Sequence, residues 1–275
     1  MAPVPEAWSG ANERVDDVSE GVLDLADGRR LAYAEWGSPG DPVAIYCHGY
    51  PGSRREIRLS APVIERRGVA ARVIALNRPG YGPSSFKPGF GFLDWPSDVE
   101  EAADRLGIGR FGLIGASGGC PFALACGRSL GDRVSRISIV VGAAPPEATG
   151  MRDGLGITGI PERAISRTLQ YGLVSVASRL GLARLITDRM QQGMAEVDSE
   201  MLCRPEVRSW FAAIVSEAFS NGGRAAAAEG PLYLNPWSFD VGGIATKTTL
   251  WYGARDRNVP ASAGRWLADR LPNAT

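Results

Sequence analysis

The stretch that decides the fold is Phe111-Gly-Leu-Ile-Gly-Ala-Ser-Gly-Gly119, an apolar run that ends in small residues around Ser117. The apolar run predicts a buried strand, and Pro121–Arg128, which follows it, predicts a helix. Small residues on either side of the serine permit a sharp turn from strand to helix. Ser117 would then stand at a helix N-terminus, where free N–H groups favour a developing negative charge. The G-x-S-x-G pattern in this setting predicts a nucleophilic serine. The alternative is a plain glycine turn, because the chain holds 35 glycines.

Other segments predict an α/β fold around this turn. Further apolar runs without alternation, typical of strands buried on both faces of a parallel sheet, are Pro42–Cys47, Ala71–Leu76, Val134–Gly142 and Thr248–Tyr252. Gly21–Leu25 and Arg30–Trp36 flank the turn Asp27-Gly28, which indicates a hairpin. Asp98–Leu106 and Ala261–Leu271 each place apolar residues on one helical face. Strands that alternate with helices in this way predict a mostly parallel central sheet with helices on both faces.

The chain divides into three parts on this basis. Residues 1–20 lack periodicity and predict a loose N-terminal arm. Residues 21–144 and 237–275 predict the α/β core. Residues 145–236 show no strand pattern but contain two apolar helical stripes, Ile165–Leu180 and Val207–Ala218. An insertion of this length is too long for a plain crossover and predicts a helical lid.

Three loops extend the pattern beyond the serine turn: Cys47-His-Gly-Tyr-Pro-Gly52, Asn77-Arg-Pro-Gly-Tyr-Gly-Pro-Ser84 and Trp251-Tyr-Gly-Ala-Arg-Asp-Arg-Asn-Val-Pro260. Together with the serine turn, they resemble the α/β-hydrolase-fold superfamily of esterases and lipases, over roughly residues 21–271. The second loop departs from the family pattern, because Asn77 stands where Asp is usual. The helical insertion resembles the family's lid in position only.

The resemblance implies a role for each matching residue. Ser117 would be the nucleophile, and Asp256 would be the acid of a catalytic triad. The backbone N–H groups of Tyr50 and Gly118 would form the oxyanion hole. The alternative for Asp256 is a solvated loop carboxylate, since Arg255 and Arg257 flank it.

The loop before Tyr50 holds two further residues of interest. The resemblance gives His48 and Gly49 a structural role, because they turn the chain toward Tyr50. His48 is also the only histidine of the sequence.

The triad requires a histidine after Asp256, and residues 257–275 contain none. We expect that the sequence is a truncated form of a complete hydrolase that lacks the last strand, the histidine loop and the closing helix. The alternative is a natural protein that has lost the base and binds a ligand. His48 lies in the wrong loop to serve as the base.

These features predict a hydrolase that cleaves a carboxylic ester or a related acyl compound without a cofactor. Alternatives are a non-catalytic binding protein on the same fold, or a C–C bond hydrolase, lactonase, peptidase or perhydrolase. The expected partner is a small apolar ester-like substrate. A net charge of zero disfavours a nucleic acid or an anionic membrane as partner, and the lack of an N-terminal signal pattern favours a cytoplasmic location. The oligomeric state stays open.

Two other features receive structural interpretations. Cys120, three residues after Ser117, is expected to pack in the core, because no base accompanies it. Arg54 and Arg55, with Arg58, Arg66 and Arg67, are expected on a solvated helix face rather than in a site for an anionic substrate.

Overall fold

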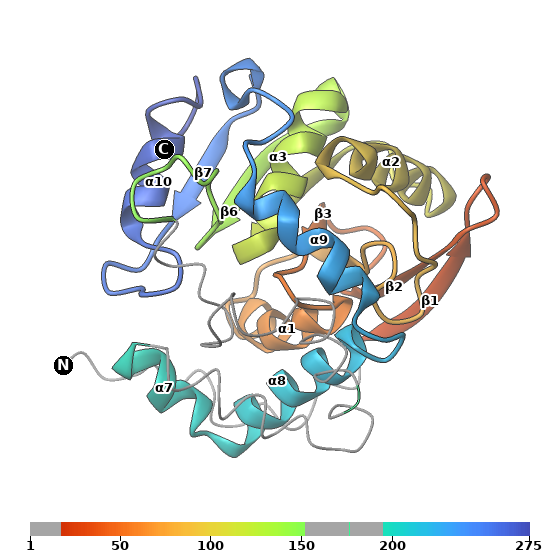
Figure 1. Cartoon of the computed structure of the whole chain (residues 1–275). Coiled ribbons are helices and arrows are strands. Elements are labelled where there is room, and N and C mark those ends of the chain that lie inside the picture. Colours follow the sequence, from red (N-terminus) through yellow and green to blue (C-terminus); the bar gives the residue numbers. More distant parts are fainter. Residues whose placement is uncertain (1–17, 152–175, 177–194) are drawn as a thin grey trace.

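The computed structural model describes residues 18–151, 176 and 195–275 (Figure 1). The strands of the described part are β1 (Ser19–Asp24), β2 (Arg30–Trp36), β3 (Val43–Cys47), β4 (Arg72–Leu76), β5 (Phe111–Ala116), β6 (Val134–Val140) and β7 (Thr248–Trp251). Its helices are α1 (Ile57–Arg66), α2 (Trp95–Arg105), α3 (Cys120–Ser129), α7 (Glu196–Leu202), α8 (Pro205–Ala218), α9 (Arg224–Leu234) and α10 (Ala261–Ala268).

The strands form one seven-stranded sheet in the order β1-β2-β4-β3-β5-β6-β7. The β1–β2 hairpin and the β2–β4 pair are antiparallel, and the remaining pairs are parallel. The mostly parallel sheet and the hairpin expected from the sequence are therefore confirmed. One boundary was wrong, since Ser19 and Glu20 belong to β1 rather than to a loose arm. They extend the strand because they pair with Glu35 and Ala34 of β2.

Helices cover both faces of the sheet, as the alternation along β4 shows. Ile74 and Leu76 pack in the core cluster that contains residues of α2 and α3. Val73 and Ala75 pack in a separate cluster with Ile57 of α1. Because successive side chains of a strand point to opposite faces, α1 lies on one face of the sheet, and α2 and α3 lie on the other.

Between β6 and β7, the described part of the chain contains helices and no strand. The second predicted stripe is α8, and the first lies outside the described residues apart from Val176. Figure 1 shows α7 and α8 along one side of the molecule next to α1, with α9 between that side and α3.

The last residues of the sequence lie beside β7. The N–H of Thr248 donates to Asn273 O, and the N–H of Leu250 donates to Thr275 O. Thr248 and Ala274 form an isolated parallel bridge, at the place where the sequence predicts an eighth strand to begin.

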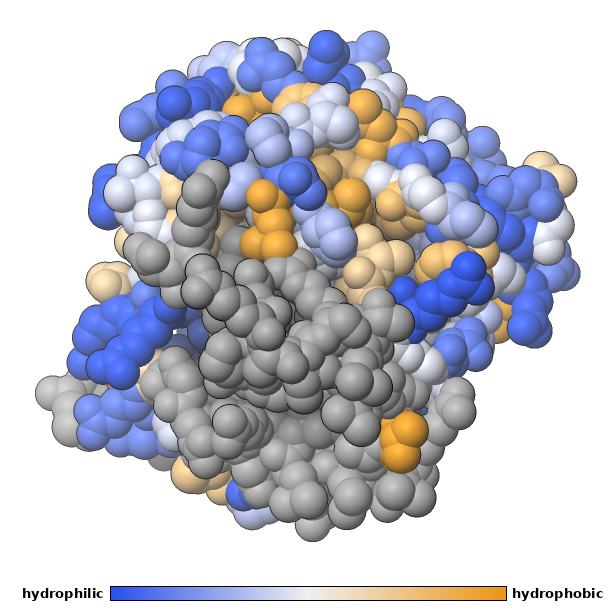
Figure 2. Space-filling view, viewed as in Figure 1, coloured by the Kyte–Doolittle hydropathy of each residue, from blue (hydrophilic) through white to orange (hydrophobic). Residues whose placement is uncertain are grey.

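The surface mixes polar and apolar residues. In the view of Figure 2, hydrophilic residues cover most of the described surface, and hydrophobic residues appear between them in small groups. No helix within residues 18–151 or 195–275 is long and apolar enough to cross a bilayer.

Candidate active site

Ser117 lies on the turn that joins β5 to α3. Its φ is +49°, in the left-handed region that residues with a side chain seldom adopt. The neighbouring glycines make the turn possible. A Cβ on Gly119 would lie 2.0 Å from Cys47 O, and one on Gly115 would lie 2.9 Å from the Cβ of Ala123. The strained serine on a strand-to-helix turn has the local geometry that the G-x-S-x-G pattern predicts.

The backbone of Tyr50 approaches the residue that follows Ser117. A Cβ on Gly118 would lie 2.5 Å from the Tyr50 Cβ and 3.0 Å from the Tyr50 backbone N, so only glycine fits there. The structure thus brings the backbones of Tyr50 and Gly118 together beside Ser117. Two backbone N–H groups so close to a serine are the kind of donors that stabilise an oxyanion.

Asp256 lies on the loop after β7. Its Oδ1 accepts hydrogen bonds from the backbone N–H groups of Asn258 (2.7 Å) and Val259 (2.9 Å). Both of those residues line the same cavity as Ser117, whereas Asp256 itself is not among its lining residues. Among residues 18–151 and 195–275, none donates a hydrogen bond to Oδ2 of Asp256.

His48 is buried and engaged on both ring nitrogens. Nδ1 lies 2.8 Å from Gly49 O and donates to it, while Nε2 accepts the backbone N–H of Arg78 (3.2 Å). Burial, and next to it the positive charge of Arg78, hold the pKa of His48 well below its usual range. A neutral imidazole with both nitrogens occupied has no free position for a proton, so His48 supports the loop and is not placed to act as a base.

Arg78 is the centre of a buried network that the sequence interpretation missed. Its Nε and Nη2 donate to both oxygens of Glu229 (2.9 and 2.6 Å). Its Nη1 donates to His48 O, and Nη2 also donates to Gly49 O. The arginine therefore ties the loop before Tyr50 to α9.

Helix α9 also contacts the serine turn and Tyr50 directly. The hydroxyl of Tyr233 lies within hydrogen-bond distance of Gly118 O (2.8 Å) and of Glu229 Oε1 (2.6 Å). The hydroxyl of Tyr50 donates to Ala226 O (2.7 Å). Glu229 is the only acidic residue of α9, and it is buried. It follows a run of alanines, and this isolated charge is the sequence signal that could have revealed the network.

Asn77 makes contacts that the usual aspartate could not make. Its Oδ1 accepts the backbone N–H of Arg54, and its Nδ2 donates to Glu217 Oε1 (2.9 Å). An aspartate would place a second carboxylate against Glu217. The amide of Asn77 therefore donates a hydrogen bond to Glu217 of α8 where an aspartate would repel it.

The expectation of a solvated arginine face is wrong for Arg54. This side chain is buried, pairs with Glu217 (2.8 Å) and Glu20 (2.6 Å), and donates to Tyr33 O. It is drawn inward because α8 brings the buried carboxylate of Glu217 over it, a contact between residues far apart in the sequence.

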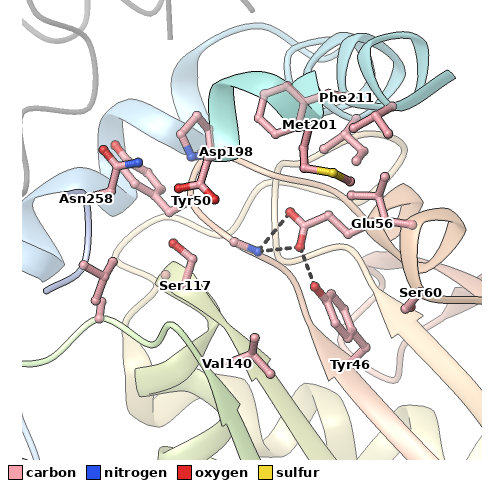
Figure 3. Close-up of a pocket in the computed structure, with 18 of the residues that line it drawn as sticks. Tyr46, Tyr50, Glu56, Ser60, Ser117, Val140, Asp198, Met201, Phe211 and Asn258 are labelled. Carbon is pink, nitrogen blue, oxygen red and sulfur yellow. Dashed lines mark hydrogen bonds between the residues drawn. The ribbon is translucent and has the colours of Figure 1, made fainter. Parts of the chain in front are cut away.

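A cavity of about 760 Å³ opens above Ser117. Residues from the core and from α7 and α8 line it (Figure 3), and its apolar part includes Leu59, Val140, Met201, Val207, Phe211 and Ile214. Its lining carries two carboxylates, Glu56 and Asp198. Burial, and in addition the nearby Asp256 carboxylate, raise the pKa of Asp198. In Figure 3 Asp198 points from α7 toward Ser117.

Glu56 holds the loop that leads to Tyr50. Both of its carboxylate oxygens accept the backbone N–H of Gly49 (3.0 Å each), and Oε2 accepts the hydroxyl proton of Tyr46 (2.9 Å). Burial raises the pKa of Glu56 from 4.5 to about 7, although these hydrogen bonds partly oppose the shift.

The raised pKa of Glu56 predicts how the free energy of unfolding depends on pH. Between pH 4.5 and 7 the folded chain holds a proton on Glu56 that the unfolded chain has lost, so this group destabilises the fold as the pH rises through that window. A shift of this size corresponds to about 3 kcal/mol. We expect Glu56→Gln to gain about 3 kcal/mol of unfolding free energy relative to wild type between pH 4.5 and 7.5, measured by urea unfolding. A pH-independent difference between the two proteins would contradict this prediction.

Cys120 packs in the core, as expected. It is fully buried, and burial raises the pKa of its thiol well above the usual value, which keeps it in the unreactive protonated form.

Comparison with known proteins places this geometry in a family. A family model described as "alpha/beta hydrolase fold" matches residues 42–275. A 2-hydroxymuconate semialdehyde hydrolase of Pseudomonas putida is 28% identical over 214 residues, which cover 76% of this chain and 69% of that protein. The chain belongs to the α/β-hydrolase-fold family.

Solved structures agree on the fold. The enol-lactonase of Burkholderia xenovorans LB400 matches with a TM-score of 0.66 at 17% identity, over 92% of this chain and 89% of its own. The esterase RhEst1 of Rhodococcus sp. ECU1013 matches with a TM-score of 0.66 at 19% identity, over 94% and 88%. The similar proteins named here are hydrolases of different kinds, so the comparisons support the hydrolase class and no single substrate.

Proposed function

We propose that this chain is a serine hydrolase that cleaves a carboxylic ester or a related acyl compound through an acyl-enzyme on Ser117. The observation that carries the proposal is Ser117 itself, held at φ +49° at the start of the helical run into α3 and facing the cavity beside the Tyr50 backbone. This is the arrangement that exposes a serine hydroxyl to a bound carbonyl group.

In the proposed reaction, Ser117 Oγ adds to the carbonyl carbon while a base takes its proton. The carbonyl oxygen becomes an oxyanion that accepts hydrogen bonds from the N–H groups of Tyr50 and Gly118, and losing one such donor typically lowers kcat by about 10²–10³. The tetrahedral intermediate then expels the leaving group, which takes the proton back from the base. Water attacks the acyl-enzyme by the same route and releases the acid. No cofactor takes part in this scheme.

The only histidine of the sequence, His48, is not placed to act as the base of this scheme. We assign Asp256 to orient a histidine, as its Oδ2, to which no described residue donates, suits an imidazole N–H donor. His48 cannot be that histidine, since Gly49 and Arg78 occupy its nitrogens. This observation favours a second candidate function, in which the same cavity binds a small apolar ligand without turnover.

The lining of the cavity supports a proposal for the acyl group of the substrate. Apolar side chains from α8 and β6 favour a small apolar acyl group. Lactone and C–C bond hydrolysis, suggested by the names of the enol-lactonase and of the muconate semialdehyde hydrolase, would use the same groups. A panel of esters, lactones and diketones separates these reactions.

A fluorophosphonate label applied to the protein from its natural source tests the proposal. We expect one adduct per chain, mapped by peptide mass to Ser117 and absent from Ser117→Ala. The mass of the same protein, compared with 29.2 kDa, shows whether the natural chain extends past Thr275. An unlabelled Ser117 in a protein that carries a histidine after Asp256 would overturn the proposal. An unlabelled Ser117 in a protein of 29.2 kDa would favour the binding function.

A further inference from the structure

The described lining of the cavity above Ser117 carries charge of one sign. Among its described lining residues the charged ones are Glu56 and Asp198, and none is Lys, Arg or His. The remaining polar groups belong to tyrosines, serines and one asparagine. A cavity with this lining repels anions and attracts hydrogen-bond donors and cations.

Glu56 differs from the buried carboxylates in the described part of the chain. Asp98, Glu217 and Glu229 are buried, and each pairs with at least one arginine. Glu56 is half-buried, lines the cavity and makes no ion pair with any described residue. A partly buried carboxylate without a cation has lost part of its hydration, so its position at a cavity wall points to a donor that arrives with a ligand.

The hydrogen bonds of Glu56 leave room for such a donor. Three protein donors, the Gly49 N–H, the Tyr46 hydroxyl and the backbone N–H of Ser53, serve its two oxygens. Above its pKa of about 7 the ionised carboxylate offers about four acceptor positions, so three donors leave one open. Figure 3 shows the Glu56 carboxylate above the Tyr46 hydroxyl, with hydrogen bonds of Glu56 drawn as dashed lines.

Glu56 is also near the reacting serine. The position of a Cβ on Gly49 would lie 3.3 Å from Glu56 Oε1 and 3.6 Å from Ser117 Cβ, so these two atoms are at most about 7 Å apart. A small compound bound at Ser117 therefore reaches Glu56 within a few bonds of its carbonyl group.

We infer that Glu56 is a specificity-determining residue, whose carboxylate accepts a hydrogen bond from a hydroxyl or ammonium group of the substrate and excludes substrates that carry a carboxylate there. The inference refines the proposed function by naming the substrate class, namely short acyl compounds with a hydrogen-bond donor. The predicted preference of Glu56 in ligand binding can be tested whether or not the protein hydrolyses an ester.

The competing explanation is that Glu56 acts only by holding Gly49 and so positioning Tyr50. Glu56→Gln separates the two roles, because the amide keeps an acceptor for the Gly49 N–H but removes the charge. A positioning role would lower the rates for all substrates by the same factor. A specificity role changes the ratios between them.

The test uses four matched methyl esters and three ligands that cannot react. The esters are methyl butanoate and its 4-hydroxy, 4-ammonio and 4-carboxylate derivatives, compared by kcat/KM. The ligands are hexan-1-ol, hexylammonium and hexanoate, whose dissociation constants are measured by NMR titration. At pH 8, above the Glu56 pKa of about 7, we expect kcat/KM of the hydroxyl and ammonium esters to be at least tenfold higher than that of the carboxylate ester. The dissociation constants of hexan-1-ol and hexylammonium should be at least tenfold lower than that of hexanoate, the size of a hydrogen bond to a charged group.

Glu56→Gln should reduce these ratios to less than about threefold. Glu100→Gln, which removes an exposed negative charge, should leave them unchanged. Hexanoate binding as tightly as hexylammonium would overturn the inference, as would ratios that Asp198→Asn removes and Glu56→Gln keeps. Failure of the proposed function looks different: no ester is hydrolysed, while the binding order of the three ligands is retained.

Discussion

Imidazole added to the 275-residue chain is expected to accelerate its hydrolysis of methyl butanoate by about 10²-fold at saturation, the lower end of what a base contributes. The site has a strained serine, two backbone N–H groups beside it and a carboxylate on a neighbouring loop, but burial and the positive charge of Arg78 lower the pKa of its one histidine, His48, and keep it neutral. A free imidazole is small compared with the cavity of about 760 Å³, and in the proposed mechanism it would act as the proton acceptor. The measurement is acid release at constant pH against imidazole concentration.

Two variants identify the source of the acceleration. Ser117→Ala removes it completely if the imidazole acts on the serine, and it also corrects for hydrolysis by imidazole in solution. Asp256→Asn lowers it, because the carboxylate orients the ring. An acceleration of equal size in Ser117→Ala would show that the protein takes no part, and would count against the nucleophile assigned here.

The part of the site that could be predicted from the sequence is local. The turn around Ser117 follows from steric limits among neighbours in the sequence, since a Cβ on Gly115 would lie 2.9 Å from the Cβ of Ala123. The sheet is local in the same sense, because its parallel strands lie within short apolar runs of the sequence. These signals depend on neighbours in the sequence, so they can be read without knowing the fold.

The network that supports the site could not be predicted in this way. Arg78 and Glu229 are 151 residues apart, and Arg54 and Glu217 are 163 apart. A single charged residue in a sequence is by default assigned to the surface, and only the fold shows which carboxylate meets which arginine. Glu56 was missed for the same reason, since it ends a run of charged residues that resembles an exposed helix start.

Asn77 shows how such a network changes a motif. The family pattern expects an aspartate, and the sequence alone offers no reason for the amide. The reason is Glu217, whose carboxylate accepts a hydrogen bond from Nδ2 of Asn77. The departure from the motif therefore follows from a helix inserted far along the chain.

Arg78→Met is expected to lower the unfolding free energy by about 3–5 kcal/mol, the usual cost of leaving one partner of a buried pair alone. Arg78 is fully buried, its partner Glu229 is 4% exposed, and its other donors hold His48 O and Gly49 O.

The double variant Arg78→Met with Glu229→Met separates the pair from its surroundings. Replacing both charges with apolar groups of similar size is often close to neutral, so the double variant should recover much of the stability lost in Arg78→Met. Arg105→Met, which breaks the exposed pair with Glu101 on α2, is the matched control and should cost about 0.5 kcal/mol or less. Urea unfolding of the four proteins gives these values. An Arg78→Met protein as stable as Arg105→Met would show that the buried pair does not hold α9 to the loop before Tyr50.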